Sequence, residues 1–560
     1  MTCFDLMFSV LLATGLCAAT TAADPPRIFF SDLESGPATG GEKNDGAFVS
    51  IYGAGFGASR DSSLVRTGGG AAAHYPIWTD NRITFQLGRA AATGEIVVIT
   101  ARGKSNAVPF TVRPGNIYFV ATTGNDGNNG AFASPWRTLL KARDALQPGD
   151  IAYALNGVSQ TTDDGQGWSA AMMLRTGGAP GRPKALVAYP GAVVTIGSIT
   201  GPAHGVRSTD FSAGGGACPG HWVFAGIVFR GGGAMTLAGP SSNWRIVAND
   251  FSCPNGDGAG ACFDTSQASN VQFLGNTVHH AGKAGASALY HGVYFSTDSN
   301  HIGAGWNTIE YVRGCRGLQV HSSPVMAGTG YNQYDIAIHD NTIHDTQCDG
   351  IVLATVDPSK GKVEVFNNII YNAGQGPNNP EHSGHWACIL AAGSTNAGAP
   401  GGGVIEVYNN TLYACGTFAT PPYASSRSAV SNGGHNQNLR IRLRNNIIYQ
   451  TGGAPYLTVW GPTGLCGVFS NCTGIGGSNN LFFGSGPAPQ NSNLVRSLSS
   501  NPLFVSPEQH DFHLRSDSPA RGAGVDTGAA NNKDGVGRGG AGGSDLGALP
   551  YVSPAPAPKL

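Results

Sequence analysis

The chain has 560 residues, enough for two or three domains, and 84 of them are glycine. Charged residues make up only 12% and the formal net charge is -1, which argues against a nucleic-acid partner and a polybasic membrane binder. After residue 23 no apolar run is long enough to cross a bilayer. The apolar stretch from Leu6 to Ala19 predicts a signal peptide over residues 1–23, and therefore a secreted protein, extracellular or periplasmic.

Residues 25–113 are predicted to form a small β-sandwich. Short alternating strands are expected at 48–52, 83–87, 96–100 and 108–112, with glycine-rich turns between them. The pattern of Val49, Ile51 and the glycines at 53, 55 and 57, closed by 105–112, resembles an immunoglobulin-like IPT/TIG domain. That resemblance implies a spacer or docking module, and we find no catalytic constellation in it.

Residues 116–550 are predicted to form the main domain. A strand at 117–120 and a Gly/Asn-rich loop at 124–130 precede a helix that should begin at Ser134, with Pro135 in its first turn, and end near Leu146. This opening resembles that of secreted right-handed parallel β-helix proteins of the pectate-lyase-like superfamily. The resemblance implies that the short helix caps the first turn of a solenoid.

From about residue 220 the chain repeats a short strand followed by an asparagine. The recurring positions, 27 to 42 residues apart, are Asn249, Asn276, Asn307, Asn341, Asn368, Asn410, Asn446 and Asn480. A strand repeat of this length without helical periodicity is typical of a parallel β-helix, in which these amides would stack in one column. Residues 501–548 resemble the terminal coil of such proteins, and 551–560 are predicted to be a disordered tail.

Nine cysteines follow the predicted signal peptide. None makes a C-x2-C pair, which argues against a structural zinc site. Short loops predict the disulfides Cys253–Cys262 and Cys466–Cys472, which an exported protein can form. Stacking of successive turns predicts a third, Cys315–Cys348.

Four consecutive repeats can be aligned at 290–296, 315–321, 348–354 and 385–391. The alignment predicts that the side chains of Val293/Phe295, Leu318/Val320, Ile351/Leu353 and Cys388/Leu390 point inward. The residues that alternate with them along each strand then face solvent. The outward positions then hold Tyr294, Gln319 and His321, and His291, Arg316 and Asp349 stack at the strand entries. This is an unusual concentration of polar side chains in a chain so poor in charge.

The resemblance to pectate-lyase-like β-helix proteins implies an enzyme that acts on polysaccharides, and on that basis the favoured function is a lyase that cleaves a uronate-containing substrate by β-elimination. Arg316 would pair with the uronate carboxylate, because a guanidinium matches it with two hydrogen bonds. His321 or His291 would be the base and Tyr294 the acid, with Lys283 as an alternative base if desolvated. Binding residues would be Gln319, Asp349, Tyr290 and Trp386, the aromatic rings stacking on sugars.

Two other functions stay open. A glycoside hydrolase of the same fold needs two carboxyl groups, for which Asp340, Asp345 and Asp349 are the candidates. A non-catalytic surface carbohydrate-binding or adhesion protein would use the same face. No metal site is predicted: calcium is possible through Asp349, but without a dense acidic cluster, and the 381–385 motif is not H-E-x-x-H. We expect a monomer.

Overall fold

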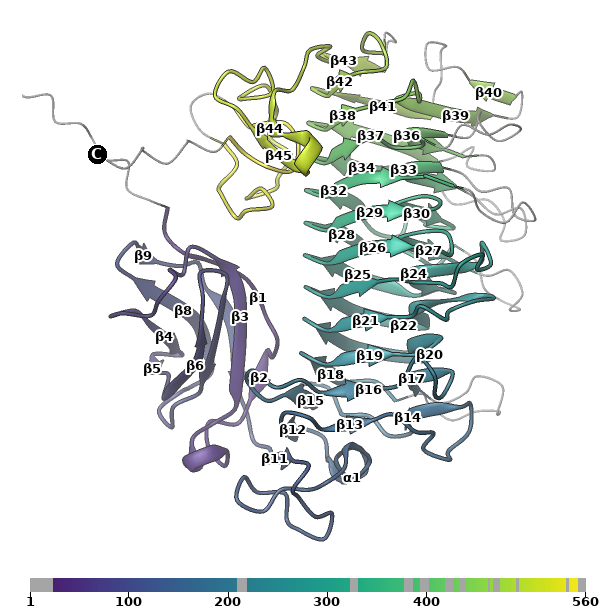
Figure 1. Ribbon diagram of the computed structural model, residues 1–560. Helices are drawn as coiled ribbons and strands as arrows, with labels where there is room; N and C mark the ends of the chain where they lie inside the picture. The colour runs from purple at the N-terminus through teal and green to yellow at the C-terminus, as the bar shows by residue number, and fades with distance from the viewer. Residues whose placement is uncertain are drawn as a thin grey trace, which may run out of the picture.

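The structure is a computed structural model, and it describes residues 24–208, 219–322, 331–376, 386–392, 402–417, 427–433, 439–461, 464–466, 474–489, 493–539 and 543–551. The predicted signal peptide, almost all of the predicted tail and Cys472 lie outside these residues. The described chain folds into an N-terminal β-sandwich and a parallel β-helix, which confirms the predicted fold class (Figure 1).

Two sheets form the sandwich around a shared apolar core. One sheet is ordered β1 (Arg27–Ser31), β3 (Phe48–Ala54), β7 (Arg82–Gln86) and β6 (His74–Trp78). The other is ordered β2 (Ser35–Gly36), β10 (Val108–Val112), β8 (Gly94–Thr100), β4 (Leu64–Thr67) and β5 (Gly70–Ala71), with β9 (Gly103–Lys104) beside β8. The four strands predicted from the sequence are all present.

The β-helix has three faces, and each turn of the chain, or rung, adds parallel strands to them. Face A consists of β11 (Ile117–Val120), β12 (Ile151–Ala154), β15 (Lys184–Ala188), β18 (Trp222–Ala225), the second halves of β20 (Gly233–Val247) and β22 (Gly260–Leu274), β25 (Asn300–Gly305), β28 (Ile336–His339), β31 (Val363–Phe366), β34 (Gly403–Tyr408), β37 (Leu439–Arg444), β41 (Ile475–Ser478) and β43 (Leu494–Val495). Face B consists of β14 (Ala170–Leu174), β17 (His204–Ser208), the first halves of β20 and β22, β24 (Tyr290–Ser296), β27 (Leu318–His321), β30 (Ile351–Ala354), β33 (Trp386–Ala392), β36 (Arg427–Asn432) and β39 (Leu457–Gly461), which pairs with β40 (Gly464–Cys466).

Face C is a separate sheet of short strands. It consists of β13 (Ser159–Gln160), β16 (Thr195–Ile196), β19 (Val228–Arg230), β21 (Asp250–Ser252), β23 (Thr277–His279), β26 (Thr308–Val312), β29 (Thr342–Thr346), β32 (Ile369–Ala373), β35 (Thr411–Tyr413), β38 (Ile447–Tyr449) and β42 (Leu481–Phe483). Alternate residues of all three faces point into one continuous apolar core.

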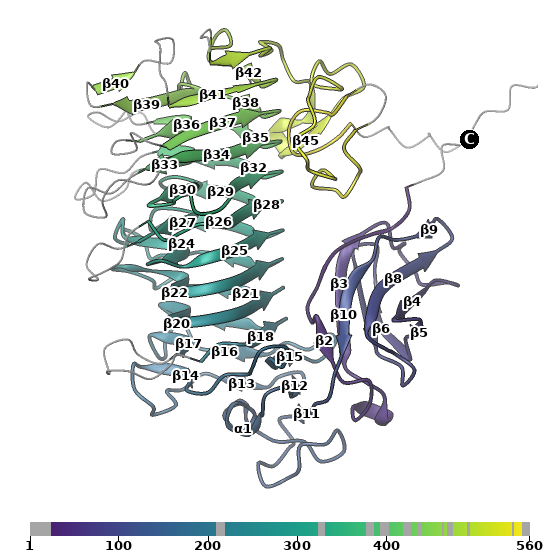
Figure 2. The same ribbon diagram turned by 180° about the vertical axis from the view of Figure 1, so that it is seen from behind.

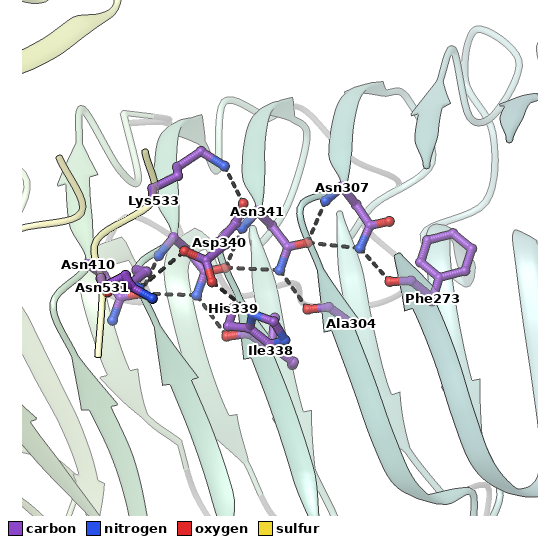
Figure 3. A network of polar contacts seen from close by, with 12 residues as sticks. Phe273, Ala304, Asn307, Ile338, His339, Asp340, Asn341, Asn410, Asn531 and Lys533 are labelled. Atoms are coloured by element: carbon purple, nitrogen blue, oxygen red, sulfur yellow. Dashed lines mark hydrogen bonds and ion pairs between the residues drawn. The ribbon is translucent and has the colours of Figure 1, made fainter. Parts of the chain in front are cut away.

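The predicted asparagine column is present at the turn between faces A and C. Asn307 illustrates its bonding. Its Oδ1 accepts from the backbone N–H and the side-chain amide of Asn276. Its own amide donates to Asn341 and to the Phe273 carbonyl (Figure 3). The same pattern links all eight predicted asparagines from Asn249 to Asn480. We call this column the asparagine ladder. It satisfies the backbone and side-chain amides of a buried turn.

The first rung is capped by helix α1 (Leu139–Ala145), which is shorter than predicted. Its N-cap is Thr138, whose side chain accepts from the Lys141 N–H, and not Ser134. Thr138 is itself held by Asp126, a longer-range contact that a local sequence pattern does not reveal. Leu139, Ala142 and Leu146 are buried as expected.

The sandwich and the C-terminal segment lie on the same side of the β-helix (Figures 1 and 2). The sandwich packs against face A, where Val187, Ala225 and Val247 belong to its core. The C-terminal segment carries the hairpin β44 (Phe504–Ser506) and β45 (Asp511–Leu514), which packs on face C. This segment covers the outside of the solenoid rather than adding a rung. Face B lies on the other side of the β-helix.

Disulfides in the described chain lie both within one turn of the β-helix, as Cys253–Cys262 does, and between neighbouring turns. Cys253–Cys262 and Cys315–Cys348 form as predicted. The structure adds Cys388–Cys415, which the sequence analysis missed. The proposed Cys466–Cys472 bond lies outside the described residues.

The predicted register is confirmed for three of the four aligned rungs. Val293 pairs with Leu318, which pairs with Ile351, and all three are fully buried. The fourth rung was shifted by one residue: Ile351 pairs with Ile389, so Ile389 points inward and Leu390 lies in an outward cluster. A one-residue shift exchanges the two sides of a strand.

Candidate active site

The polar side chains predicted to gather on face B do so. Tyr294 pairs with Gln319 and Ser296 pairs with His321 on neighbouring strands β24 and β27. His291, Arg316 and Asp349 occupy successive rungs, because Gly292 N–H donates to the Arg316 carbonyl and Gly317 N–H to the Asp349 carbonyl. The Cys315–Cys348 disulfide directly precedes two of these residues and ties their rungs together.

Direct contacts organise this set into two groups. The Tyr294 hydroxyl lies 3.1 Å from Nδ1 of His321, and the His291 ring meets the Tyr294 ring edge-on at 5.3 Å. Arg316 Nη1 donates to Gln319 Oε1 at 2.7 Å, and Arg316 Nε lies 3.6 Å from Asp349 Oδ2. One group can therefore exchange a proton, and the other presents a guanidinium.

Burial sets the protonation of the first group. It lowers the pKa of His321 to about 4, with help from the positive charge of Arg316. The pKa of His291 falls well below its usual value for the same reasons. Burial raises the pKa of the Tyr294 phenol. At neutral pH both imidazoles are therefore uncharged and the phenol keeps its proton.

Asp264 on β22 belongs to the same site, although the sequence analysis missed it. It is the pairing partner of Tyr294 on the preceding rung. Burial raises the pKa of its carboxyl to about 7, an effect partly offset by the charge of Arg207. The signal was available, because aligning one further repeat at 260–266 places Asp264 in the outward column.

The outward column continues through two more rungs. Thr236 pairs with Asp264, and Arg207 on β17 pairs with Thr236. The Arg207 guanidinium lies 4.3 Å over the ring of Trp168, which is 49% exposed, and 3.2 Å from His204. An exposed aromatic ring therefore flanks the polar column at this end.

We name the face-B patch by its members: Asp264, His291, Tyr294, Arg316, Gln319, His321 and Asp349. Within the described chain, four of its buried side-chain atoms have no hydrogen-bond partner. These atoms are Asp264 Oδ1, His291 Nδ1, Arg316 Nε and Asp349 Oδ2. Arg316 Nε and Asp349 Oδ2 face each other in an ion pair at 3.6 Å, so the atoms of the patch left without any partner in the described chain are Asp264 Oδ1 and His291 Nδ1. Buried polar atoms are normally paired, so these two indicate a place for a ligand or for water.

Three predicted site residues do not have the surroundings that were expected. Tyr290 is 2% exposed and its hydroxyl donates to the Gly232 carbonyl at 2.5 Å, while Trp386 is 0% exposed, so neither ring faces a sugar. Tyr290 was placed outward by alternation but lies at the strand entry, whereas Trp386 has the parity of Cys388 and Leu390, which the alignment placed inward. Lys283 is exposed and pairs with Asp257 at 2.5 Å, so it is not a desolvated base.

The carboxylates considered for a hydrolase are separated. The Asp340 carboxylate accepts from Asn367 and lies against His339 in the turn beside the asparagine ladder. Asp345 contacts His344 and Asn372 on face C. Asp349 is fully buried on face B, where its carboxylate accepts from the Ala387 N–H and its pKa is raised by burial to about 7.

The described residues contain no group of three or more histidine, cysteine or acidic side chains placed to hold a metal ion. The 381–385 motif lies outside them. No helix in this part of the chain is long and apolar enough to cross a membrane.

Comparisons with known proteins found one family model that matches part of the chain and several solved structures that are similar to it. Residues 333–532 match the family model described as "Disaggregatase related". No curated protein matches the chain. The matched span includes Asp349 but begins after His321.

The solved structures similar to this chain include the pectate lyase Pel9A, with 16% identity over 78% of this chain and 97% of that one, and a TM-score of 0.43. A family 28 exopolygalacturonase of Yersinia enterocolitica has 12% identity over 85% and 94% of the two chains, with a TM-score of 0.41. A rhamnogalacturonan lyase has 15% identity over 69% and 86%, with a TM-score of 0.37.

Proposed function

We propose that this protein is a secreted polysaccharide lyase that cleaves a uronate-containing polysaccharide by β-elimination at the face-B patch. The observation that carries the proposal is a tyrosine–histidine pair beside an arginine, next to two buried polar atoms, Asp264 Oδ1 and His291 Nδ1, that have no hydrogen bond in the described chain. The three disulfides of the described chain support an exported protein, because such bonds persist in oxidising compartments.

The reaction moves one proton and breaks one bond to oxygen. A base removes the proton from the carbon next to the uronate carboxylate. The bond between the adjacent carbon and the leaving sugar oxygen breaks, a carbon–carbon double bond forms, and the leaving oxygen takes up a proton. The site must therefore supply a base, an acid and a positive charge for the carboxylate.

His321 and Tyr294 supply the base and the acid. Neutral His321 accepts the substrate proton, and the protonated Tyr294 phenol donates one to the leaving oxygen. After the products leave, His321 returns its proton to Tyr294 across their 3.1 Å contact. The two residues are then restored without a further proton donor.

Arg316 supplies the positive charge. Its Nη1 is oriented by Gln319 and its Nε by the buried Asp349, which fixes the guanidinium beside the reacting pair. Asp264 acts on Tyr294 from the preceding rung: its negative charge raises the pKa of the phenol. We therefore place Arg316 in substrate binding, and Asp264, Gln319 and Asp349 as positioning residues.

A hydrolase on this patch has less support. Asp264 and Asp349 are its two carboxyl groups, and they are three rungs apart, or ~14 Å at ordinary strand spacing. Inverting and retaining glycosidases place their carboxyl groups about 5–9.5 Å apart. The spacing therefore favours elimination over hydrolysis.

The test is to incubate the purified protein with a panel of uronate and neutral polysaccharides, measuring the ultraviolet absorbance of unsaturated uronates and the reducing ends in parallel. We expect both signals to rise with at least one uronate polysaccharide and to be lost in His321→Ala. Reducing ends without absorbance would indicate a hydrolase. If neither the absorbance nor the reducing ends increase, and the protein is retained on a polysaccharide gel, the result would indicate a binding protein. Either result would overturn the proposal.

A further inference from the structure

A second polar cluster lies between the sandwich and the β-helix, remote from face B. On the sandwich it consists of Asp32, Ser50, Tyr52 and Arg82, from the sheet that faces the solenoid. The cavity in front of it has a volume of about 380 Å³. This is close to the lower end of the ~300–1,000 Å³ range of small-molecule sites, which often occur at domain interfaces.

The opposite wall of the cavity is formed by small residues of the β-helix. Ala188, Gly226 and Ala248 line it at the turn after face A. At the corresponding turn of later rungs the chain carries the larger Trp306 and Asp340, just before Asn307 and Asn341 of the ladder. The small side chains on this stretch leave room that the interface does not fill.

The cavity is held open by fixed contacts on both sides. Arg245 of the β-helix donates through Nε to the Asp32 carbonyl at 2.9 Å and through Nη1 to Glu34 at 2.7 Å. Tyr189 donates to the Glu42 carboxylate at 2.7 Å. The two domains are thus joined around the space, and a ligand entering it would find a formed site.

The polar wall includes one buried donor, on Arg82, that has no hydrogen bond in the described chain. Within the described chain, Nε of Arg82 is buried without a hydrogen bond, and no ion pair joins Arg82 to Asp32. The Arg82 guanidinium lies 5.5 Å over the Tyr52 ring. Burial raises the pKa of the Asp32 carboxyl to about 6. Asp32 Oδ1 accepts from the Leu33 and Ser50 N–H groups at 2.7 and 2.8 Å, so among the described residues of this wall the group without a partner is the Arg82 donor.

We infer that this cavity binds one neutral sugar ring. A sugar has hydroxyl groups at its edge, which would accept from Arg82 and donate to Asp32, and C–H groups on its faces, which would pack on the alanines of the other wall. A neutral ring suits the site because one positive and one negative group line it, and a sugar carboxylate would meet the charge of Asp32. The inference does not depend on cleavage at face B.

Saturation-transfer NMR on the full chain tests this with glucose, galactose, mannose and xylose, and with glucuronate and galacturonate as charged counterparts. We expect saturable binding of at least one neutral sugar, and binding at least tenfold weaker for its uronate at pH 8, where Asp32 is ionised. Binding of none of the four neutral sugars would overturn the inference. Equal or tighter binding of the uronate that persists in Arg316→Gln, which lacks the guanidinium proposed to bind uronates at face B, would overturn it too.

Two variants locate the site. Arg82→Gln removes the unpaired donor and Ala188→Leu fills the space, and each should weaken binding tenfold or more. The exposed Arg102→Gln is the matched control in the sandwich, and Tyr294→Phe is the control for face B. Both controls should bind as the parent does, and Ala188→Leu should keep polysaccharide turnover. Unchanged binding in both cavity variants, or its loss in Tyr294→Phe, would contradict the assignment.

Discussion

The asparagine ladder and the face-B patch are both stacks of polar side chains on successive rungs of one solenoid, yet their bonding differs. In the ladder, the amide of each asparagine is paired with the next rung and with a backbone carbonyl. In the patch, Asp264 Oδ1 and His291 Nδ1 are buried without a partner in the described chain, and Arg316 Nε and Asp349 Oδ2 meet only in an ion pair at 3.6 Å. Repetition alone therefore does not separate a structural column from a site, whereas the pairing of its atoms does.

The largest effect should come from the patch. Tyr294→Phe removes one hydroxyl, which lies 3.1 Å from Nδ1 of His321. We expect the kcat/KM for unsaturated uronate formation to fall about 10²-fold or more, with little change in thermal stability. Tyr311→Phe, on the exposed tyrosine of face C, is the matched control and should leave the rate unchanged. A Tyr294→Phe enzyme with parental turnover would remove Tyr294 from the mechanism.

The ladder should respond in stability. Asn341→Ala removes bonds to the Asn307 N–H and amide, to Asn368 and to the Ala304 carbonyl. Because buried groups are left unpaired, the free energy of unfolding should fall by about 3 kcal/mol or more in urea titrations. The exposed Asn156→Ala should cost less than about 1 kcal/mol. Similar losses for both would show that the ladder adds nothing specific.

Asp264→Asn tests the same comparison through the pH dependence of stability. It replaces a buried carboxyl group of the face-B patch, one oxygen of which has no hydrogen bond in the described chain. The folded-state pKa of Asp264 is raised to about 7 from 3.8, so the folded state disfavours its charged form. The wild type should therefore lose stability relative to Asp264→Asn as the pH rises from about 4 to 7. The unfolding free energies of the two proteins, compared at pH 4, 5.5 and 8, check this. A constant difference would contradict it.

A smaller effect on thermal stability is expected from a substitution in the C-terminal segment. His513 lies 2.5 Å from Asp511 and 2.7 Å from Asp534, which raise its pKa to about 9. A raised histidine pKa stabilises the fold fully below pH 6.5, and this contribution is lost as the pH rises through 9. His513→Asn should lower the melting temperature at pH 6 and match the wild type above pH 10. An equal deficit at both pH values would exclude the charged bridge.

Local repeats made much of the fold predictable. The asparagines identified the rungs, and the alternation of Val293 and Phe295 gave the inward side, because a strand has a period of two. The helix start at Thr138 was missed because its supporting contact comes from Asp126, outside the local pattern. The packing of 504–514 on face C was missed because a sequence repeat does not indicate what covers it.

The candidate site was predictable only where the register was correct. Tyr294, Arg316 and His321 lie together because their rungs align without insertion. Leu390 was placed inward because its rung is shifted by one residue relative to the aligned pattern, and Ile389 points inward there instead. Burial was the other missing quantity: sequence alternation does not show that Asp349 is fully enclosed or that Lys283 is exposed and paired.

A double-mutant cycle on Tyr294 and His321 tests the central claim most directly. The kcat/KM for unsaturated uronate formation is measured for the wild type, Tyr294→Phe, His321→Ala and the double variant. If the two residues act as one proton-transfer unit, the double variant should be about as impaired as the worse single variant. Losses that multiply, or a turnover that none of the three variants reduces, would contradict the account.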